Sequence, residues 1–295
     1  RGTSVYLVDR VVPMLPERLS NELCSLKPNE DKLCFSAVFQ MNEKAEVLDQ
    51  WFGKTIIHSD RRFDYAQVQE IIENSEGEMK DEILKLHELS SMLRSLRFKK
   101  GAFSFERVEV KFQLDNTGKP IGVYFKEAKD SNWLIEEFML LANKKVAEKI
   151  GKVKKGTQAK TFVYRIHDRP DPEKIMNFSN FVHRFGYSLK TGTDQAIAHS
   201  MNKLVHDIKG KNEQYILESL AIRTMAKAKY SGKNIGHYGL AFPFYTHFTS
   251  PIRRYPDLMV HRLLQSYLDG EKSENSRKNE MRCELSSARE ELAVQ

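Results

Sequence analysis

GHYGLAFPFYTHFTSPIRRY, residues 236–255, is the densest stretch of aromatic and cationic side chains in the chain. Five aromatic residues stand between positions 238 and 248, beside His237 and His247. A Ser-Pro-Ile-Arg-Arg step follows at 250–254. The stretch indicates either a packed core cluster with an exposed arginine pair or a site for phosphate or nucleic acid.

The Ser-Pro-Ile-Arg-Arg step has the pattern of a helix start. Thr249 or Ser250 is a good N-cap, and Pro251 suits the first helical position. Arg253 and Arg254 would then lie in the first turn, where free backbone N–H groups and the helix dipole attract anions. Because a guanidinium group can engage two phosphate oxygens together, phosphate is a natural ligand for this arrangement.

Length and composition are those of an ordinary globular protein. The chain has 295 residues, enough for two domains or one large one, and 40% of them are hydrophobic. No apolar run approaches the roughly 18 residues of a membrane span, so we expect no membrane partner. The three cysteines fit neither a disulfide framework nor a zinc pair, and we expect reduced thiols in a cytoplasmic protein. The net charge of +7 favours a polyanionic partner.

The periodicity of apolar residues predicts a mixed α+β fold, in which strands of residues 1–130 form a sheet and later helices pack around it to shape a channel. The helix at 130–150 is expected to carry Glu136 and Glu137 on its outer face. The predicted hairpins are 32–40 with 45–59 and 103–114 with 121–125; the predicted helices are 64–74, 80–100, 130–150, 172–184, 193–208, 211–229 and 251–268.

Four segments resemble one known family in the right order. HYGLAFPFYTHFTSPIRRYPDLMVHRLL is similar to the signature of the RNB catalytic domain of the RNase II/RNase R exoribonucleases. RGTSVYLVDRVVPMLPERLSNELCSLKPNEDKLCFS, LIEEFMLLAN and YRIHDRPDPEKI resemble further segments of that domain, with bacterial ribonuclease R the nearer branch. The resemblance implies a partial RNB domain over 1–290, a truncated helix starting at 291–295, and no cold-shock or S1 barrel. Because the chain opens at Arg1 without methionine and a helical pattern breaks off at Gln295, we expect truncation at both ends.

The resemblance assigns two aromatic residues to the 3′ end of RNA. Tyr6 matches the tyrosine that stacks on the terminal base, and Phe105 resembles the aromatic residue that clamps the stacked bases from the other side. Stacking tolerates any base because each base has a π face. The alternative for Phe105 is a core residue of a strand.

The resemblance also implies contacts with ribose and phosphate. Tyr65 and Glu136 match the pair that contacts ribose near the scissile bond and favours RNA through the 2′-hydroxyl, and Glu137 is the less favoured neighbour. Without the resemblance, Glu136 would be read as a surface charge. Arg253 matches the arginine that contacts the phosphate at the cleaved bond. Arg254 is expected to bind RNA through a contact with its backbone, or else to have a structural role.

The family's reaction uses divalent cations, and the resemblance therefore implies Mg²⁺ as cofactor. In the family, closely spaced aspartates before the RGTSVYL segment hold the metal; here only scattered acids such as Asp64, Asp168 and Asp171 occur, so we predict no metal ligands in this chain. Near its end the chain has Leu285 where the family pattern suggests histidine.

Two functions follow from different classes of protein. The first is a 3′-to-5′ exoribonuclease that releases nucleoside 5′-monophosphates from single-stranded RNA, with these 295 residues inactive by themselves. The second is a catalytically dead RNA-binding or scaffold module. For the first, we expect a monomeric parent protein and proteins of RNA decay as partners.

Overall fold

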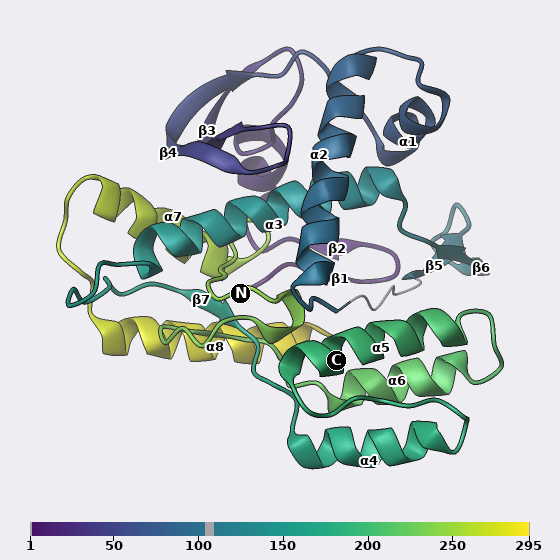
Figure 1. The fold of residues 1–295 in the computed structure, drawn as a ribbon. Coiled ribbons are helices and arrows are strands. Elements are labelled where there is room, and N and C mark those ends of the chain that lie inside the picture. The colour runs from purple at the N-terminus through teal and green to yellow at the C-terminus, as the bar shows by residue number, and fades with distance from the viewer. Residues whose placement is uncertain (1, 104–108, 295) are drawn as a thin grey trace.

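The computed structural model describes residues 2–103 and 109–294, which form a mixture of helices and short sheets (Figure 1). The strands are β1 (Val5–Tyr6), β2 (Val11–Val12), β3 (Asp31–Met41), β4 (Val47–His58), β5 (Glu109–Leu114), β6 (Pro120–Lys126), β7 (Tyr164–Ile166) and β8 (Lys229–Ser231). The helices are α1 (Tyr65–Asn74), α2 (Lys80–Lys99), α3 (Asp130–Gly151), α4 (Pro172–His183), α5 (Asp194–Ile208), α6 (Gln214–Thr224), α7 (Tyr255–Leu268) and α8 (Ser276–Val294), with short turns η1 (Arg18–Leu23) and η2 (Tyr238–Leu240).

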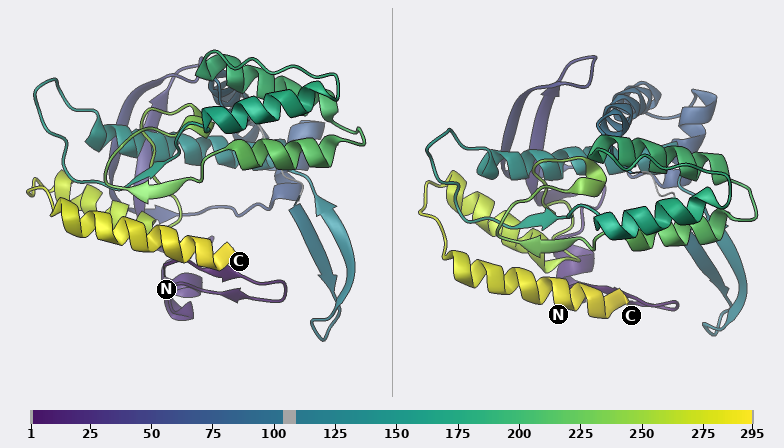
Figure 2. Two further views of the ribbon diagram at one scale, coloured as in Figure 1. Left: turned by 90° about the horizontal axis from the view of Figure 1, so that it is seen from below. Right: turned by 60° about the horizontal axis from the view of Figure 1, so that its bottom comes forward.

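The expectation of one sheet is wrong for the described residues. Their strands form four separate antiparallel pairs, β1–β2, β3–β4, β5–β6 and β7–β8. Alternating apolar residues and a turn predict pairing inside a hairpin, but they do not say whether hairpins join edge to edge. Here the pairs are set apart, and β5–β6 projects from the body as an arm (Figure 2).

The long hairpin β3–β4 confirms the strands predicted at 32–40 and 45–59 and covers part of the main core. Its register runs from Asp31 opposite His58 to Met41 opposite Val47. The Phe35 ring lies 5.6 Å from the Phe248 ring, edge to face. One face of the hairpin therefore packs on the segment that leads into α7.

Two apolar cores hold the helices together. The first joins α3, α7, α8 and the β7–β8 pair and includes Val146, Phe162, Val260, Leu264 and Cys283. The second lies inside the group of α4, α5 and α6, which Figure 1 shows side by side at the bottom of the view. No helix within the described residues is long and apolar enough to cross a membrane.

The C-terminal helix differs from its prediction. It is one helix, α8, that begins at Ser276, so a boundary at 290 would cut through it. Leu285 lies on α8 with 58% of its surface exposed, so it is not a core residue. Gly2 packs on this helix, because a Cβ at Gly2 would lie 3.0 Å from Cβ of Arg289. The N-terminal segment and the end of α8 are thus neighbours, as both views of Figure 2 show.

Candidate functional site

The Ser-Pro-Ile-Arg-Arg step forms a turn in front of α7, and the predicted helix start is wrong by about one turn. α7 begins at Tyr255, and the backbone of Arg254 is extended, with φ −135° and ψ 123°. The side chain of Asp257 accepts the Ser250 N–H at 2.7 Å and so closes the turn. Pro256 is the second residue of α7, so the proline of the first turn is Pro256 and not Pro251. The arginines therefore precede the helix and do not lie in its first turn.

Arg254 points back onto the helix. Its Nε lies 2.9 Å from Oδ2 of Asp257, and its Nη2 donates to Oδ1 at 3.0 Å. Asp257 is fully buried, and this burial raises the pKa of its carboxyl while Arg254 opposes the rise. The guanidinium of Arg254 is therefore paired with a buried carboxylate, and its predicted contact with RNA stays a prediction.

Arg253 is exposed and is held by its backbone. Its carbonyl oxygen accepts the Ser4 N–H at 3.0 Å and the Thr3 hydroxyl at 3.1 Å. Thr3 and Arg254 form an isolated antiparallel β-bridge. Strand β1, which contains Tyr6, begins directly after Ser4. The Tyr6 side chain is 62% exposed. Two of the predicted RNA-contacting residues, far apart in the chain, thus lie on hydrogen-bonded neighbouring segments.

Asn143 ties the same turn to α3. It is buried, and its Oδ1 accepts the backbone N–H groups of Phe248 and Thr249 at 2.8 and 3.2 Å. Its Nδ2 donates to the Tyr245 hydroxyl at 3.2 Å. The sequence analysis missed this residue, although a buried polar side chain inside the apolar run LIEEFMLLAN must find partners elsewhere.

The two adjacent glutamates of α3 have different surroundings. Glu137 is buried and pairs with the buried Arg97 of α2, so the expectation that it faces outward is wrong. Glu136 is 45% exposed in its side chain and accepts from Nη2 of Arg97 at 3.3 Å. The accessible carboxylate is therefore Glu136, which lies about 10 Å before Asn143 along the helix axis.

Tyr65 begins the neighbouring helix α1 and is 47% exposed. Gln69 of α1 accepts the Ser131 N–H at the start of α3 at 3.0 Å, so the helices bearing Tyr65 and Glu136 are joined. The Nζ of Lys126 lies 5.6 Å from the Tyr65 ring centroid. Phe105 lies outside the described residues.

A group of partly buried histidines accompanies the turn and was not assigned a role from the sequence. The rings of His167 and His237 stack with centroids 5.0 Å apart, and His247 Nδ1 lies 2.9 Å from the Tyr230 hydroxyl. Burial lowers the pKa of His237 to about 3 and lowers that of His247 well below its ordinary value. These imidazoles are therefore neutral; His237 packs through ring contacts, and His167 and His247 also hydrogen-bond.

Acidification should consequently destabilise the fold. In the unfolded chain, His237 takes up a proton below about pH 6.5, whereas in the folded chain it stays neutral down to about pH 3. The unfolded state therefore binds more protons in this window, and the free energy of unfolding rises with pH across it. Between pH 7.5 and 5, His237 alone should remove about 2 kcal/mol from the free energy of unfolding. Urea unfolding of wild type and His237→Phe at pH 7.5 and 5 measures this loss. The drop in the free energy of unfolding between the two pH values should be about 2 kcal/mol smaller in His237→Phe than in wild type. An equal drop in both proteins would contradict a neutral His237.

The described residues do not fit a divalent metal ion. No group of three or more histidine, cysteine or acidic side chains among them could hold one. The scattered acids have other partners: Asp64 and Asp171 cap α1 and α4 through backbone N–H groups, and Asp168 accepts the Arg169 N–H. No metal-dependent step is therefore derived from these side chains.

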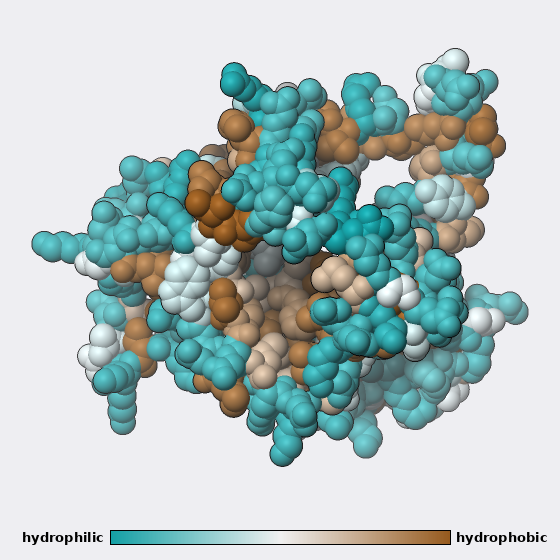
Figure 3. Space-filling view, turned by 90° about the horizontal axis from the view of Figure 1, so that it is seen from above, coloured by the Kyte–Doolittle hydropathy of each residue, from teal (hydrophilic) through white to brown (hydrophobic). Residues whose placement is uncertain are grey.

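Seen from above, this molecule is hollowed near the centre of the view, with a largely hydrophilic rim (Figure 3). The exposed Arg253 of the turn lies beside the segment that carries the exposed Tyr6, while Tyr65 and the accessible carboxylate of Glu136 lie on the joined helices α1 and α3. Such groups suit a polyanion that also carries planar rings and hydroxyls.

Comparison with known proteins agrees with this chemistry. The RNB domain matches residues 1–270. Ribonuclease R 1 of Lactococcus lactis is 37% identical over 284 residues, covering 93% of this chain and 34% of the relative. Ribonuclease R of Thermotoga maritima is 40% identical over 275 residues, covering 91% of this chain and 38% of the relative. The chain therefore spans somewhat more than a third of the length of these curated relatives.

A solved structure and a further relative bear on what such a chain does. The structure of Mycoplasma genitalium RNase R in complex with ribose methylated single-stranded RNA matches 99% of this chain and 47% of that one, with a TM-score of 0.86 at 28% identity. A relative named Inactive exonuclease DIS3L2, from Arabidopsis thaliana, is 35% identical over 296 residues and covers 92% of this chain and 28% of its own length.

Proposed function

The chain belongs to the RNB-domain family, and from this we propose that the whole protein is a hydrolytic 3′-to-5′ exoribonuclease acting on single-stranded RNA. The observation that carries the proposal is the Arg253 turn, which is hydrogen-bonded on one side to the segment preceding Tyr6 and on the other to α3, the helix of Glu136. Groups assigned to a base, a ribose and a phosphate thus meet on one scaffold.

Each side chain has a defined part in the proposal. Tyr6 and Phe105 stack on bases near the 3′ end, which suits an enzyme that must accept every sequence. Tyr65 and Glu136 contact ribose, the carboxylate accepting the 2′-hydroxyl proton that distinguishes RNA from DNA. Arg253 engages the phosphate at the bond to be cleaved, where it would balance developing negative charge.

The proposal includes Mg²⁺ as the cofactor, with ligands outside the described residues. It also includes a cytoplasmic, monomeric protein that works with RNA-decay proteins. These points follow from the family resemblance alone. The products would be nucleoside 5′-monophosphates.

Binding of RNA by residues 1–295 tests the role of Arg253. In Arg253→Ala, affinity for a single-stranded oligonucleotide should fall about tenfold to a hundredfold, because a charge-assisted hydrogen bond to phosphate is lost. The slope of log affinity against log salt should also become shallower by about 0.7. Fluorescence anisotropy would measure both quantities. Arg184, exposed on the opposite group of helices, supplies the matched control Arg184→Ala, and equal losses in the two variants would refute the assignment.

The second candidate function is an RNA-binding module without catalysis. It is favoured by the relative named an inactive exonuclease, which is 35% identical over 296 residues. A 3′-end degradation assay of the whole protein decides between the two. Shortening that requires Mg²⁺ supports the enzyme, whereas RNA binding without shortening supports the module. Residues 1–295 alone should bind RNA and leave its length unchanged; Mg²⁺-dependent shortening by them would contradict the absence of ligands.

A further inference from the structure

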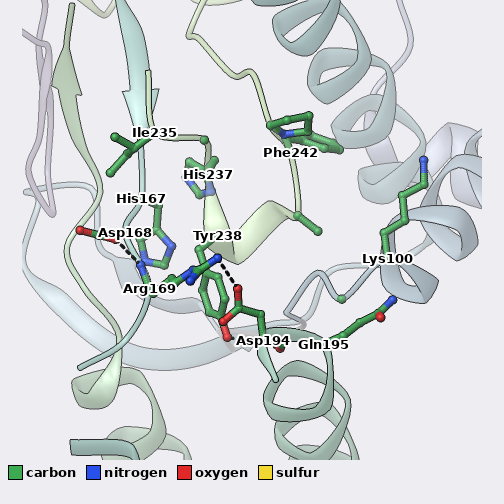
Figure 4. A pocket seen from close by; sticks show the side chains of 14 residues that line it. Lys100, His167, Asp168, Arg169, Asp194, Gln195, Ile235, His237, Tyr238 and Phe242 are labelled. Atoms are coloured by element: carbon green, nitrogen blue, oxygen red, sulfur yellow. Dashed lines mark hydrogen bonds and ion pairs between the residues drawn. The ribbon is translucent and has the colours of Figure 1, made fainter. Parts of the chain in front are cut away.

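A cavity of about 450 Å³ opens beyond the end of α2, between the start of α5 and the loop around η2. Figure 4 shows Lys100, Arg169, Asp194, His237, Tyr238 and Phe242 around it. Among the described residues, none of the side chains assigned to RNA above lines it. Its volume is within the range of small-molecule sites, about 300–1,000 Å³.

One side of the cavity is built of flat rings. His237 stacks on His167 at 5.0 Å with an interplanar angle of 25°, and the Tyr238 ring lies 6.3 Å from His167. Burial keeps His237 neutral by lowering its pKa to about 3. A neutral, aromatic wall of this kind favours a planar ring over a bare anion.

Charged groups also border the cavity: Arg169 and Asp194 lie beside the rings, and Lys100 lies across from them (Figure 4). Arg169 is 73% exposed in its side chain, and its Nη2 lies 2.9 Å from a carboxylate oxygen of Asp194. Lys100 is exposed and has no ion-pair partner within residues 2–103 and 109–294. The cations suit a phosphate, and a carboxylate such as Asp194 is the usual acceptor for ribose hydroxyls.

The cavity wall is also tied to the residues that follow α2. Phe103 donates its N–H to the Gly239 carbonyl at 2.9 Å, and Asn202 donates to the Ala102 carbonyl at 2.7 Å. Gly101, which lines the cavity, is therefore held next to α5 and to the loop around η2.

We propose that this cavity is a mononucleotide site that takes the nucleoside 5′-monophosphate after its release from RNA. The inference rests on the proposed function, which supplies that product. The rings contact the base, Asp194 accepts a ribose hydroxyl, and Arg169 and Lys100 bind the phosphate. The site is separate from the Arg253 turn, where the phosphate of the intact chain is bound.

Calorimetric titration of residues 1–295 with AMP, without divalent metal, tests the site. Wild type should bind AMP saturably, and Arg169→Ala and Lys100→Ala should each weaken binding about tenfold, because each removes one charge-assisted contact. Arg184→Ala and Arg253→Ala should bind AMP like wild type. Circular dichroism would show that all four variants fold, since the altered side chains are exposed.

Parallel measurements with single-stranded RNA separate the two proposals. RNA bound without any saturable AMP binding at millimolar concentration overturns the mononucleotide site and leaves the proposed function standing. AMP binding lost in Arg253→Ala but kept in Arg169→Ala also overturns it, because the nucleotide would then occupy the RNA turn. If wild type binds neither AMP nor single-stranded RNA, both proposals are overturned.

Discussion

Arg254→Ala should lower the free energy of unfolding by about 3–5 kcal/mol, whereas Arg253→Ala, one residue earlier, should change it little. Removing Arg254 leaves the fully buried carboxylate of Asp257 without its cation, 2.9 Å away. A buried ion without its partner carries its desolvation cost uncompensated. Urea unfolding of the two single variants at pH 7.5 measures the difference directly.

The double variant Arg254→Ala/Asp257→Asn is the control, because it removes both charges and should recover much of the loss. The deficit of Arg254→Ala should also shrink as the pH falls. The pKa of Asp257 is already raised by burial, and without Arg254 it rises further, so the folded variant takes up a proton that relieves the unpaired charge. A deficit that is small, or constant with pH, would contradict a buried ion pair.

Glu137→Ala should destabilise the fold by about 3 kcal/mol, at the lower end of the range for a broken buried pair. Among the described residues, Arg97, which is 5% exposed, would keep the half-exposed Glu136 at 3.3 Å as its one side-chain partner within hydrogen-bond reach. Glu136→Ala should cost at most about 1 kcal/mol, because its carboxylate is partly solvated and Arg97 retains Glu137. Thermal or urea unfolding would measure both effects.

Glu137→Ala should be the more destabilised variant, but Glu136→Ala should be the one that is more impaired in recognising RNA. At a temperature where both remain folded, Glu136→Ala should lose discrimination between an RNA and a DNA oligonucleotide, and Glu137→Ala should retain it. Glu136→Gln keeps the shape and removes the charge, so it distinguishes a ribose acceptor from a packing contact. If Glu136→Ala were instead the more destabilised variant and discriminated better between RNA and DNA than Glu137→Ala, then Glu136 would be the structural residue and Glu137 the ribose contact.

Local patterns predicted the elements well where neighbours in sequence are neighbours in space. The long hairpin, α2 and α3 were placed to within a few residues, because strand alternation and helical spacing are local properties. The start of α7 was misplaced because Thr249, Ser250 and Pro251 make a good local start signal. The side chain of Asp257 competes with that signal by closing a turn on the Ser250 N–H.

The sequence by itself determined the family, the mixed fold and which motifs contain the candidate residues, since motif identity and periodicity are carried by the order of residues. Only the tertiary structure decided which member of each adjacent pair is buried. Glu137 is buried because Arg97 lies 40 residues earlier on α2, and Arg253 is held by Thr3, 250 residues away. Two neighbours of the same type have nearly the same local sequence, so distant partners must distinguish them. Those same partners set the Arg253 turn between the N-terminal segment and α3.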